Sequence, residues 1–438
     1  MELSSPFKQP GFRRLAFSFT VNELGDWLGI VALAVLVFDR TDSAMATAGL
    51  FLGTSFVPAV LAPALVARIE RTPPRITLPV IYCLEAGVFA SLALLVESFS
   101  LPAVIALATL DGILLLIGRS LTRAVAAAML EPSGQLRAGN AILNMGFTVG
   151  AAAGPALGGL VVAGFGIQSA LLLNALSFLV IGIVLFAGPL PHVQPEAGDW
   201  KDRLRAGMTY VAARMPLRRL LMAQGAAFIF FAAVIPIEVI YAKETLGAGD
   251  SGYGALLASW GIGMVLGSVV FAAKRRSGLP LLLVLSTIAV GTAYLGLAVA
   301  PTLLIACAVS VLGGTGNGIQ WVSVVSAIQE MTRSTMQARV MSVLESVSSA
   351  MPGFGFIVGG LVATSHSPRA TFLVAGAGVL VVVAVAARSL AGSPWAKGEG
   401  KFGQAEYDAD GDQADASDNV ELAQQPTVSG VAGRERGN

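Results

Sequence analysis

The stretch Gly150-Ala-Ala-Ala-Gly154-Pro155-Ala-Leu-Gly158-Gly159 lies inside an apolar run, residues 141–165, that is just long enough to cross a bilayer as a helix. Glycines recur every four residues from Gly146 to Gly158, so one helix face has no side chains and a neighbouring backbone can approach it closely. Pro155 removes a hydrogen bond from the helix ladder and favours a bend. We therefore expect a bent, smooth-faced helix that acts as a sliding or rocking contact.

Composition indicates an all-α membrane protein. Of the 438 residues 55% are hydrophobic and only 13% are charged, whereas a soluble protein carries about 25% charged residues. The apolar residues come in blocks of about 20, the length of a membrane-spanning helix. The segment Gly158-Gly-Leu-Val161 recurs as Gly359-Gly-Leu-Val362, which favours two similar halves. We predict twelve spans, at residues 15–38, 44–66, 76–95, 101–122, 141–165, 170–190, 220–242, 253–273, 279–299, 303–325, 341–364 and 371–390.

These spans divide the chain into two six-helix bundles with a linker between them. We expect an N-terminal segment at residues 1–14, bundles at 15–190 and 220–392, a linker at 191–219 and a disordered acidic tail at 393–438. The linker contains a predicted amphipathic helix, one face of which carries Trp200, Leu204, Met208 and Val211. We expect this helix to lie on the inner leaflet, and a regulatory or partner-binding role is the alternative.

The placement of Lys and Arg residues predicts the orientation in the membrane. All but three of the 28 basic residues fall on the same side of the predicted spans as the two termini, the exceptions being Arg40, Lys243 and Arg369. Loops rich in Lys and Arg stay in the cytoplasm. We therefore expect a multi-pass protein of the bacterial inner membrane with both termini in the cytoplasm.

Ionisable groups inside apolar spans are the main functional signal, because each is costly in lipid unless it faces a cavity or a partner. The first span carries Asn22, Glu23 and Asp26, and Asn22 and Asp26 share a face one turn apart. The fourth span carries Asp111 near its middle. A carboxyl group that meets apolar surroundings and water in turn takes up and releases a proton. We expect these residues to couple protons to transport; the alternative is a structural role, with the carboxylates neutral or paired with Arg119 or with a polar group of another helix.

The later spans carry further candidates. Glu238 stands towards the outer end of the seventh span, and Asn317 and Gln320 follow the glycine-rich residues 313–316 in the tenth. These two side chains either contact substrate or unwind the helix near it, or they make interhelical hydrogen bonds that only hold the bundle together. Aromatic candidates for an apolar binding cavity are Trp27, Phe228, Phe230, Phe231 and Trp321.

Several classes of protein lack support in the sequence. We find no Walker motif, nucleophile elbow, zinc signature or dinucleotide fingerprint, which argues against an ATP-driven pump, an enzyme and a bound cofactor. Cys83 and Cys307 both fall inside apolar spans, so neither a disulfide nor a metal site is expected. The net charge of +1 gives no reason to expect a nucleic-acid partner.

In its six-plus-six layout with a cytoplasmic linker, the chain resembles the major facilitator superfamily. The glycine-rich fifth span is similar to the antiporter motif of exporters in that superfamily, with matches at Gly146, Gly150, Gly154, Pro155, Gly158 and Gly159. Gly25-Asp26, residues 136–142 and residues 329–342 resemble the branch that contains macrolide and siderophore exporters.

The resemblance implies two six-helix bundles around a central cavity lined by helices one, four, seven and ten. It would place four candidate residues near one space, namely Asp26, Asp111, Glu238 and Asn317. It also implies alternating access, in which proton influx drives substrate out. One loop departs from the superfamily: the position that usually holds Asp is Ala67, followed by Arg68, Glu70 and Arg71. We expect these three charged residues to form the gating loop, with the missing Asp contact either lost or supplied by Glu70.

Together these features predict a secondary active transporter that exports an amphipathic small molecule by proton antiport. The substrate is expected to be drug-like, macrolide-like or siderophore-like. The expected partners are this substrate, protons and lipid, and the chain is expected to be a monomer. Two alternatives stay open: a proton-coupled uptake symporter, and a non-transporting membrane protein such as a receptor or a lipid scramblase.

Overall fold

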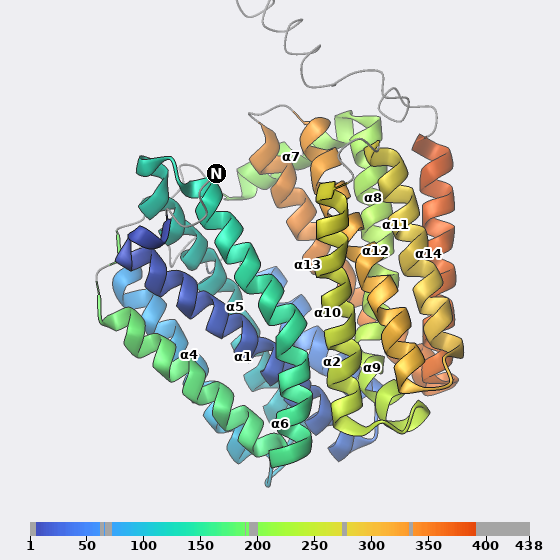
Figure 1. The fold of residues 1–438 in the computed structure, drawn as a ribbon, viewed down its shortest axis with the longest axis horizontal. Coiled ribbons are helices and arrows are strands. Elements are labelled where there is room, and N and C mark those ends of the chain that lie inside the picture. Colours follow the sequence, from blue (N-terminus) through green and yellow to red (C-terminus); the bar gives the residue numbers. More distant parts are fainter. Residues whose placement is uncertain are drawn as a thin grey trace, which may run out of the picture.

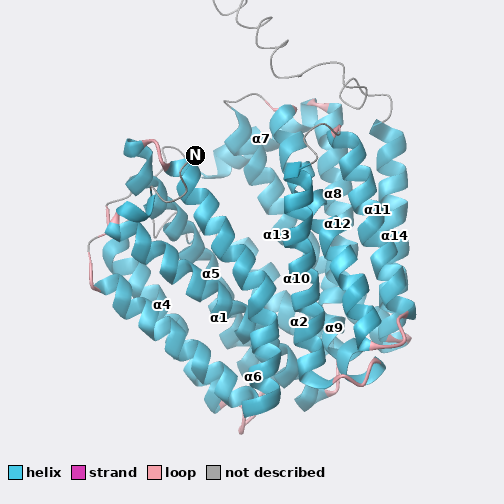
Figure 2. Cartoon of the chain, in the orientation of Figure 1, coloured by secondary structure: helices cyan, strands magenta, loops and turns pink. Residues whose placement is uncertain are grey.

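A computed structural model of the chain describes residues 6–61, 65, 72–188, 190–191, 200–273, 278–332 and 336–390. Within these residues the protein consists of helices and loops, with no strand (Figure 1, Figure 2). The first half contains η1 (Pro6–Lys8), α1 (Pro10–Thr41), α2 (Ala44–Phe51), η2 (Leu52–Phe56), α4 (Pro74–Leu94), α5 (Leu101–Leu130), η3 (Glu131–Ser133) and α6 (Leu136–Phe186). The second half contains α7 (Trp200–Ala213), α8 (Met215–Val234), η4 (Ile235–Ile237), α9 (Glu238–Ile240), η5 (Tyr241–Thr245), α10 (Gly249–Ala273), α11 (Leu279–Val299), α12 (Leu303–Glu330), α13 (Gln337–Ser365) and α14 (Pro368–Leu390).

The long helix α6 is two antiparallel helices joined at Gly166, whose φ of 82° lies outside the helical range. Residues of its first half approach α1 in ascending order, and residues of its second half approach α1 in descending order. The chain therefore reverses at Gly166 without an intervening loop. The neighbouring pairs that establish this order are Gly146–Thr20 and Gly158–Leu28 for the first half. For the second half they are Asn174–Gly25 within α6 and Gly188–Arg14 just beyond its end at Phe186.

Eleven helices in the described part of the chain are long and apolar enough to cross a membrane. Because α6 accounts for two crossings, the described residues supply the twelve predicted spans. The prediction of an all-α membrane protein with two six-helix bundles is confirmed. The observed helices extend beyond several predicted spans; α1, for example, includes residues on both sides of the predicted 15–38.

Helix ends follow local signals in the sequence. Proline occupies the first turn of α1, α4, α8 and α11, where a backbone donor would have no partner. Ser43 caps α2 by accepting a hydrogen bond from the backbone N–H of Ala46 at 3.2 Å. Asp42 ends α1 in the left-handed conformation, with a φ of 49°. These two adjacent residues set the tight connection between the first two spans.

The two bundles meet along two pairs of helices, α6 with α10 and α2 with α13. Glycine permits the first contact, since a Cβ placed on Gly159 would stand 2.9 Å from the Cα of Gly254. Aromatic side chains form the second, where the ring centroids of Phe51 and Phe356 are 5.8 Å apart. In Figure 1 the bundles lie together at the end that carries α9 and diverge towards the end that carries the N-terminus and α7.

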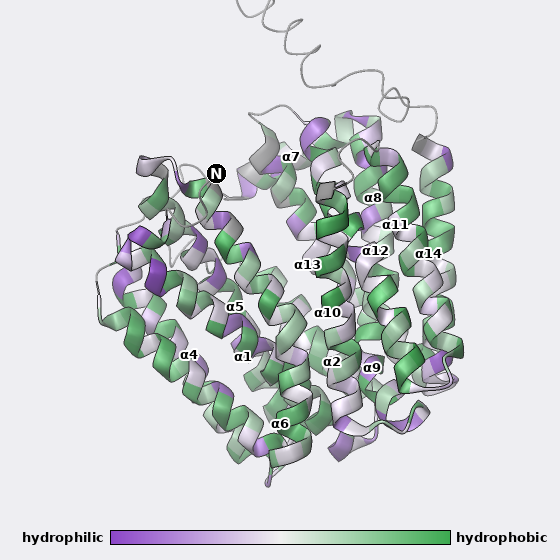
Figure 3. Ribbon diagram, viewed as in Figure 1, coloured by the Kyte–Doolittle hydropathy of each residue, from purple (hydrophilic) through white to green (hydrophobic). Residues whose placement is uncertain are grey.

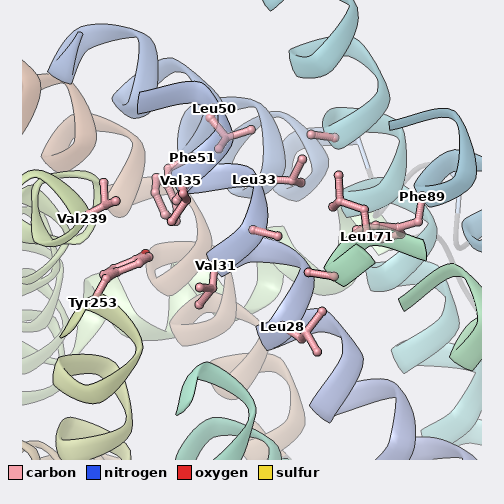
Figure 4. Packing of buried hydrophobic residues seen from close by; sticks show 14 of the residues in the cluster. Leu28, Val31, Leu33, Val35, Leu50, Phe51, Phe89, Leu171, Val239 and Tyr253 are labelled. Atoms are coloured by element: carbon pink, nitrogen blue, oxygen red, sulfur yellow. The ribbon is translucent and has the colours of Figure 1, made fainter. Parts of the chain in front are cut away.

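Buried apolar side chains form a core that continues from one bundle into the other. Figure 4 shows Val35 of α1 beside Phe51 of α2, with Val239 and Tyr253 of the second bundle on the other side. Figure 3 shows hydrophobic residues along most helix surfaces, whereas hydrophilic residues gather at helix ends and at positions within α1 and α5. Polar groups inside an apolar exterior are the arrangement expected for a protein that functions in lipid.

The linker helix α7 rests on the second bundle. Leu204 and Val211 pack in an apolar cluster with residues of α8, α12 and α13. A Cβ on Gly207 would stand 2.5 Å from the carbonyl oxygen of Arg339 in α13. Part of the face predicted to lie on the leaflet is therefore used for packing, while Met208 stays 53% exposed. The sequence pattern cannot distinguish a helix on the leaflet from a helix on the second bundle, because both surfaces bind an apolar helix face.

Two predictions fall on residues that are not described. Arg68, Glu70 and Arg71 of the predicted gating loop lie outside the described residues, and so does the predicted acidic tail at 393–438.

Candidate functional site

One face of α1 presents polar side chains to the interior of the first bundle. Glu23 is fully buried and Asn22 is 2% exposed. Asn22 Nδ2 donates a hydrogen bond to Asp26 Oδ2 at 3.0 Å. A separation of four residues is one helical turn, so the shared face expected from the sequence is present.

Arg119 of α5 reaches the α1 carboxylates from the neighbouring helix. Its Nε donates to Glu23 Oε1 at 2.8 Å, and its Nη2 donates to Glu23 Oε2 at 2.6 Å. This two-bond fork is the strong form of an arginine–carboxylate pair. The same Nη2 lies 3.5 Å from Asp26 Oδ2. Glu23 is therefore held by a buried ion pair, whereas Asp26 keeps one buried oxygen, Oδ1, without a hydrogen-bond partner.

A cavity of about 250 Å³ lies beside this cluster, between the two bundles. Asp26, Asp111 and Arg119 form its charged wall, and Oδ1 of Asp111 is buried without a hydrogen-bond partner. Most of the remaining wall is aliphatic or aromatic and comes from both bundles. Its larger side chains are Trp27, Ile30, Leu33, Phe51, Phe89, Leu115, Ile235, Tyr253, Leu257 and Phe356. An apolar space with a few converging polar groups is the usual form of a small-molecule site.

Glu238 and Asn317, which the family resemblance would bring to the same space, do not line this cavity. Glu238 begins α9 and interacts electrostatically with Tyr253 and Tyr294. Asn317 Oδ1 accepts a hydrogen bond from Trp260 Nε1 at 3.3 Å, between α12 and α10. Of the four residues expected together, the cavity wall contains Asp26 and Asp111. The rotation of α12 about its axis, which spacing in the sequence does not reveal, turns Asn317 towards α10.

Gln320 lies in a different part of the second bundle. Its Nε2 donates a hydrogen bond to Oε1 of Gln224 in α8 at 2.7 Å, and both side chains are buried. Both also line a second pocket, which has no lining residue in common with the central cavity. The hydrogen bond between Gln320 and Gln224 is the interhelical contact that the sequence left open as the alternative to a substrate contact.

The glycine-rich motif of α6 packs directly on the polar face of α1. A Cβ on Gly154 would stand 2.5 Å from the Cβ of Trp27, which lines the cavity. A Cβ on Gly158 would stand 3.1 Å from the Cα of Leu28. On its other side the same helix meets α10, where Pro155 presents its carbonyl oxygen to Gly254. The motif thus contacts a cavity helix of its own bundle and an interface helix of the other bundle.

A charged link closes the end of the molecule opposite α7. Lys243 Nζ in η5 contacts Asp39 Oδ1 of α1 at 2.5 Å and Asp250 Oδ1 of α10 at 2.7 Å. Because Asp39 belongs to the first bundle, Lys243 bridges the two bundles. Arg40 binds the carbonyl of Val96 at the same end.

Sequence reasoning gave Arg119 as an alternative partner of the α1 carboxylates without predicting which of them it binds, and it missed the partners of Lys243. Arg119 and Glu23 are 96 residues apart, and no local pattern joins two positions so distant in the chain. Of the predicted aromatic candidates Trp27 lines the cavity, and Phe51, Tyr253 and Phe356, which were not singled out, line it as well. Glu85 of α4 is fully buried, and neither of its carboxyl oxygens has a hydrogen-bond partner. Among the described residues there is no group of three His, Cys, Asp or Glu side chains that could hold a metal ion.

Comparison with known proteins identifies the family. Residues 2–396 match the family described as Transmembrane secretion effector. The chain belongs to this family. Transmembrane secretion effectors are of the major facilitator type, so the chain is a multi-pass membrane transporter of that type. Comparison with curated proteins found no match.

Solved structures show the same fold in other transporters. The nucleoside transporter NupG shares 12% sequence identity with a TM-score of 0.71, and the alignment covers 87% of this chain and 99% of that one. A bacterial homolog to the human lysosomal transporter Spinster, in an inward-facing and unoccupied conformation, shares 15% identity with a TM-score of 0.70, covering 88% and 98%. A POT family transporter in complex with a thioalcohol conjugated peptide shares 12% identity with a TM-score of 0.69, covering 86% and 95%. At these identities the likeness concerns the fold of this transmembrane secretion effector.

Proposed function

We propose that this transporter exports an amphipathic small molecule by proton antiport. The observation that carries the proposal is the pair of cavity carboxyl groups, Asp26 and Asp111, each with one buried oxygen that has no hydrogen-bond partner. A carboxyl group in this situation is free to take up a proton or to bind a substrate. Glu23, by contrast, is already engaged by Arg119.

The wall of the cavity supports an amphipathic substrate. Aromatic and aliphatic side chains supply most of the contact surface, which suits a hydrophobic body. Arg119 makes ion pairs with Glu23 and Asp26, whereas Asp111 makes no ion pair with the described residues, so the three carboxyl groups outnumber the one cation here. This charge balance favours neutral and cationic compounds over anions.

The arrangement of the bundles supports alternating access. Lys243 links the bundles at one end, and the bundles diverge towards the end of the N-terminus and α7. The basic side of the chain contains the termini and the linker, so we take the divergent end as cytoplasmic. In this orientation the link from Lys243 to Asp39 lies at the outer end, and the bundles diverge towards the cytoplasm. Opening the outer end requires the ion pair between Lys243 and Asp39 to break and α6 to tilt against α10.

The sequence matches at Gly25-Asp26 and in the α6 motif favour the macrolide and siderophore exporter branch, in the inner membrane of a bacterium. The protein is taken to act as a monomer, because the proposed mechanism needs only the two bundles of one chain.

Transport by everted membrane vesicles tests this proposal, with ethidium as the amphipathic cation. Vesicles that hold the wild-type protein and an acidic interior should accumulate ethidium, and collapse of the pH gradient should abolish the uptake. Asp26→Asn and Asp111→Asn should each reduce the rate at least about ten-fold, the effect of removing one essential proton-transfer group. The control is Glu97→Gln, which changes an exposed acid outside the cavity.

Three outcomes would contradict the proposal. Ethidium transport at wild-type rates in both the Asp26→Asn and the Asp111→Asn variants would show that neither residue couples protons to transport. Substrate movement into cells along with protons would identify an uptake symporter instead. Lipid movement without any solute flux would identify a scramblase.

A further inference from the structure

We infer that the second bundle carries a second binding site, for an uncharged amphipathic molecule whose single polar group both donates and accepts a hydrogen bond. The site is a pocket of about 330 Å³ whose polar end is formed by Gln224 and Gln320. It is independent of the central cavity and of the proposed antiport.

The pocket lies among α8, α11, α12 and α14, within the second bundle. Pro280, in the first turn of α11, and Ala387, in the last turn of α14, place it in the half of the bundle nearest α7. Its volume is at the lower end of the range for small-molecule sites, about 300–1,000 Å³. A molecule with one short apolar chain fits this space.

The wall of the pocket excludes ionised ligands. Among the described residues of the wall, the only polar side chain apart from the two glutamines is that of Thr287, whose hydroxyl already donates to the carbonyl of Leu283 at 2.7 Å. No charged residue in the described part of the chain lines it, and an unpaired charge in such surroundings is very costly. The apolar part of the wall comprises Leu220, Ala223, Ala227, Pro280, Leu281, Leu283, Val284, Val382, Val383, Ala386 and Ala387.

The two glutamines leave one donor and one acceptor unused. Gln320 Nε2 donates to Gln224 Oε1 at 2.7 Å, while Gln224 Nε2 and Gln320 Oε1 are buried without partners. The two residues are 3% and 2% exposed. If both amides were rotated so that nitrogen and oxygen exchange places, the pair would still keep one N–H group and one carbonyl without a hydrogen-bond partner. Buried polar groups without partners destabilise a protein, so a ligand that meets both groups would stabilise this one.

A hydroxyl or a carboxamide group has the required chemistry. It accepts a hydrogen bond from the free N–H of one glutamine and donates one to the free carbonyl of the other. An alkane does neither, and an amine or a carboxylic acid is charged at neutral pH. The matching ligand is therefore a medium-chain alcohol or amide, with its chain along the aliphatic wall and its polar group between Gln224 and Gln320.

Photolabelling of the full-length protein in phosphatidylcholine nanodiscs tests this site, with an octanol that carries a diazirine on its chain as the probe. Labels should concentrate on residues 220–227 of α8 and 280–287 of α11, and octanol should displace the probe whereas octane should not. Replacing both glutamines, as Gln224→Met with Gln320→Met, keeps the volume and removes the polar pair, so the variant should fold. Loss of two neutral hydrogen bonds should weaken labelling of the pocket about ten-fold or more.

Asp111→Asn serves as the control, because it alters the central cavity and should leave labelling of the second pocket unchanged. Labels spread evenly over lipid-facing helices would overturn the inference, and so would equal displacement by octane. Wild-type labelling in the double variant would do the same. An absence of label from the pocket would mean that the two free amide groups bind water and that the proposed site does not exist. Since no transport is measured, none of these results bears on the proposed antiport.

Discussion

Gly150 of α6 lies directly against Glu23 of α1: a Cβ placed on Gly150 would stand 2.6 Å from the Cβ of Glu23 and 2.9 Å from its backbone carbon. The glycine-rich motif therefore touches the residue that holds Arg119 in its ion pair. Since the same helix packs on α10 across the bundle interface, α6 connects the buried charges with the surface at which the bundles meet.

Gly150→Leu should separate α1 from α6. A large side chain has no room beside Glu23, and overpacking of this kind costs about 1–3 kcal/mol. We expect a lower melting temperature for the purified protein and loss of ethidium transport in vesicles. Gly164→Leu is the matched control, because no atom of another helix lies within 4 Å of the Cβ position at Gly164. Equal stability of the two variants would argue that α1 and α6 do not pack as described.

Arg119→Met should destabilise the protein through Glu23. This change leaves a fully buried carboxylate without its cation, and breaking a buried pair costs about 3–5 kcal/mol. Thermal unfolding in detergent should report a large decrease in stability. Adding Glu23→Gln removes the unpaired charge and should recover most of the loss. If the double variant is no more stable than Arg119→Met alone, the ion pair is not the origin of the effect.

Lys243→Met should favour opening at the outer end. The variant loses both contacts of Lys243, with Asp39 across the bundle interface and with Asp250 in its own bundle. Partly exposed pairs contribute about 0.2–1 kcal/mol each, so the population of the outward-open state should rise a few-fold. A cysteine at Leu257, in the cavity wall, should react faster with a membrane-impermeant thiol reagent added outside the cell.

The control for this experiment is Arg75→Met, which removes an exposed charge at the start of α4, away from the link. It should leave the labelling rate at Leu257→Cys unchanged. An equal increase in both variants would mean that general loss of positive charge, and not the link between bundles, changes access.

Cross-linking α2 to α13 should stop transport. The Cβ position of Gly360 stands 3.0 Å from the Cβ of Ala48, and a disulfide needs a Cβ separation of about 3.5–4.5 Å, so a small shift suffices. Oxidised Ala48→Cys with Gly360→Cys, in a protein that carries Cys83→Ser and Cys307→Ser, should lose ethidium transport. Reduction should restore it, and each single cysteine variant should be insensitive to oxidant. Undiminished transport by the oxidised double variant would contradict a mechanism in which the bundles separate at this end.

The fold was accessible from the sequence because its determinants are local. Each apolar run is long enough for one crossing of the membrane. The alternation of loops rich and poor in Lys and Arg supports the number of crossings, because a missed helix would invert every later loop. Proline at the first turn and Ser43 as a cap mark where helices begin. Spacing also predicted the shared face of Asn22 and Asp26, because four residues make one turn of the same helix.

The site was less accessible because it depends on how helices rotate against each other. Nothing local joins Arg119 to Glu23, since the two residues lie on different helices. Asn317 and Gln320 are three residues apart on α12, yet one faces Trp260 and the other faces Gln224. An apolar span with low amphipathicity gives no indication of which side is turned inward. The sequence therefore identified the polar residues but did not show which of them lie together in one site.

The reversal at Gly166 has a mechanical consequence. Because one residue with positive φ joins the halves of α6, they form a hairpin without a connecting loop that could absorb movement. The first half bears on α1 and α10, and the second half bears on α4, where Gly182 packs beside Cys83. We therefore expect a tilt imposed at α10 to be transmitted through α6 to α4, so that the first bundle moves as one rigid body.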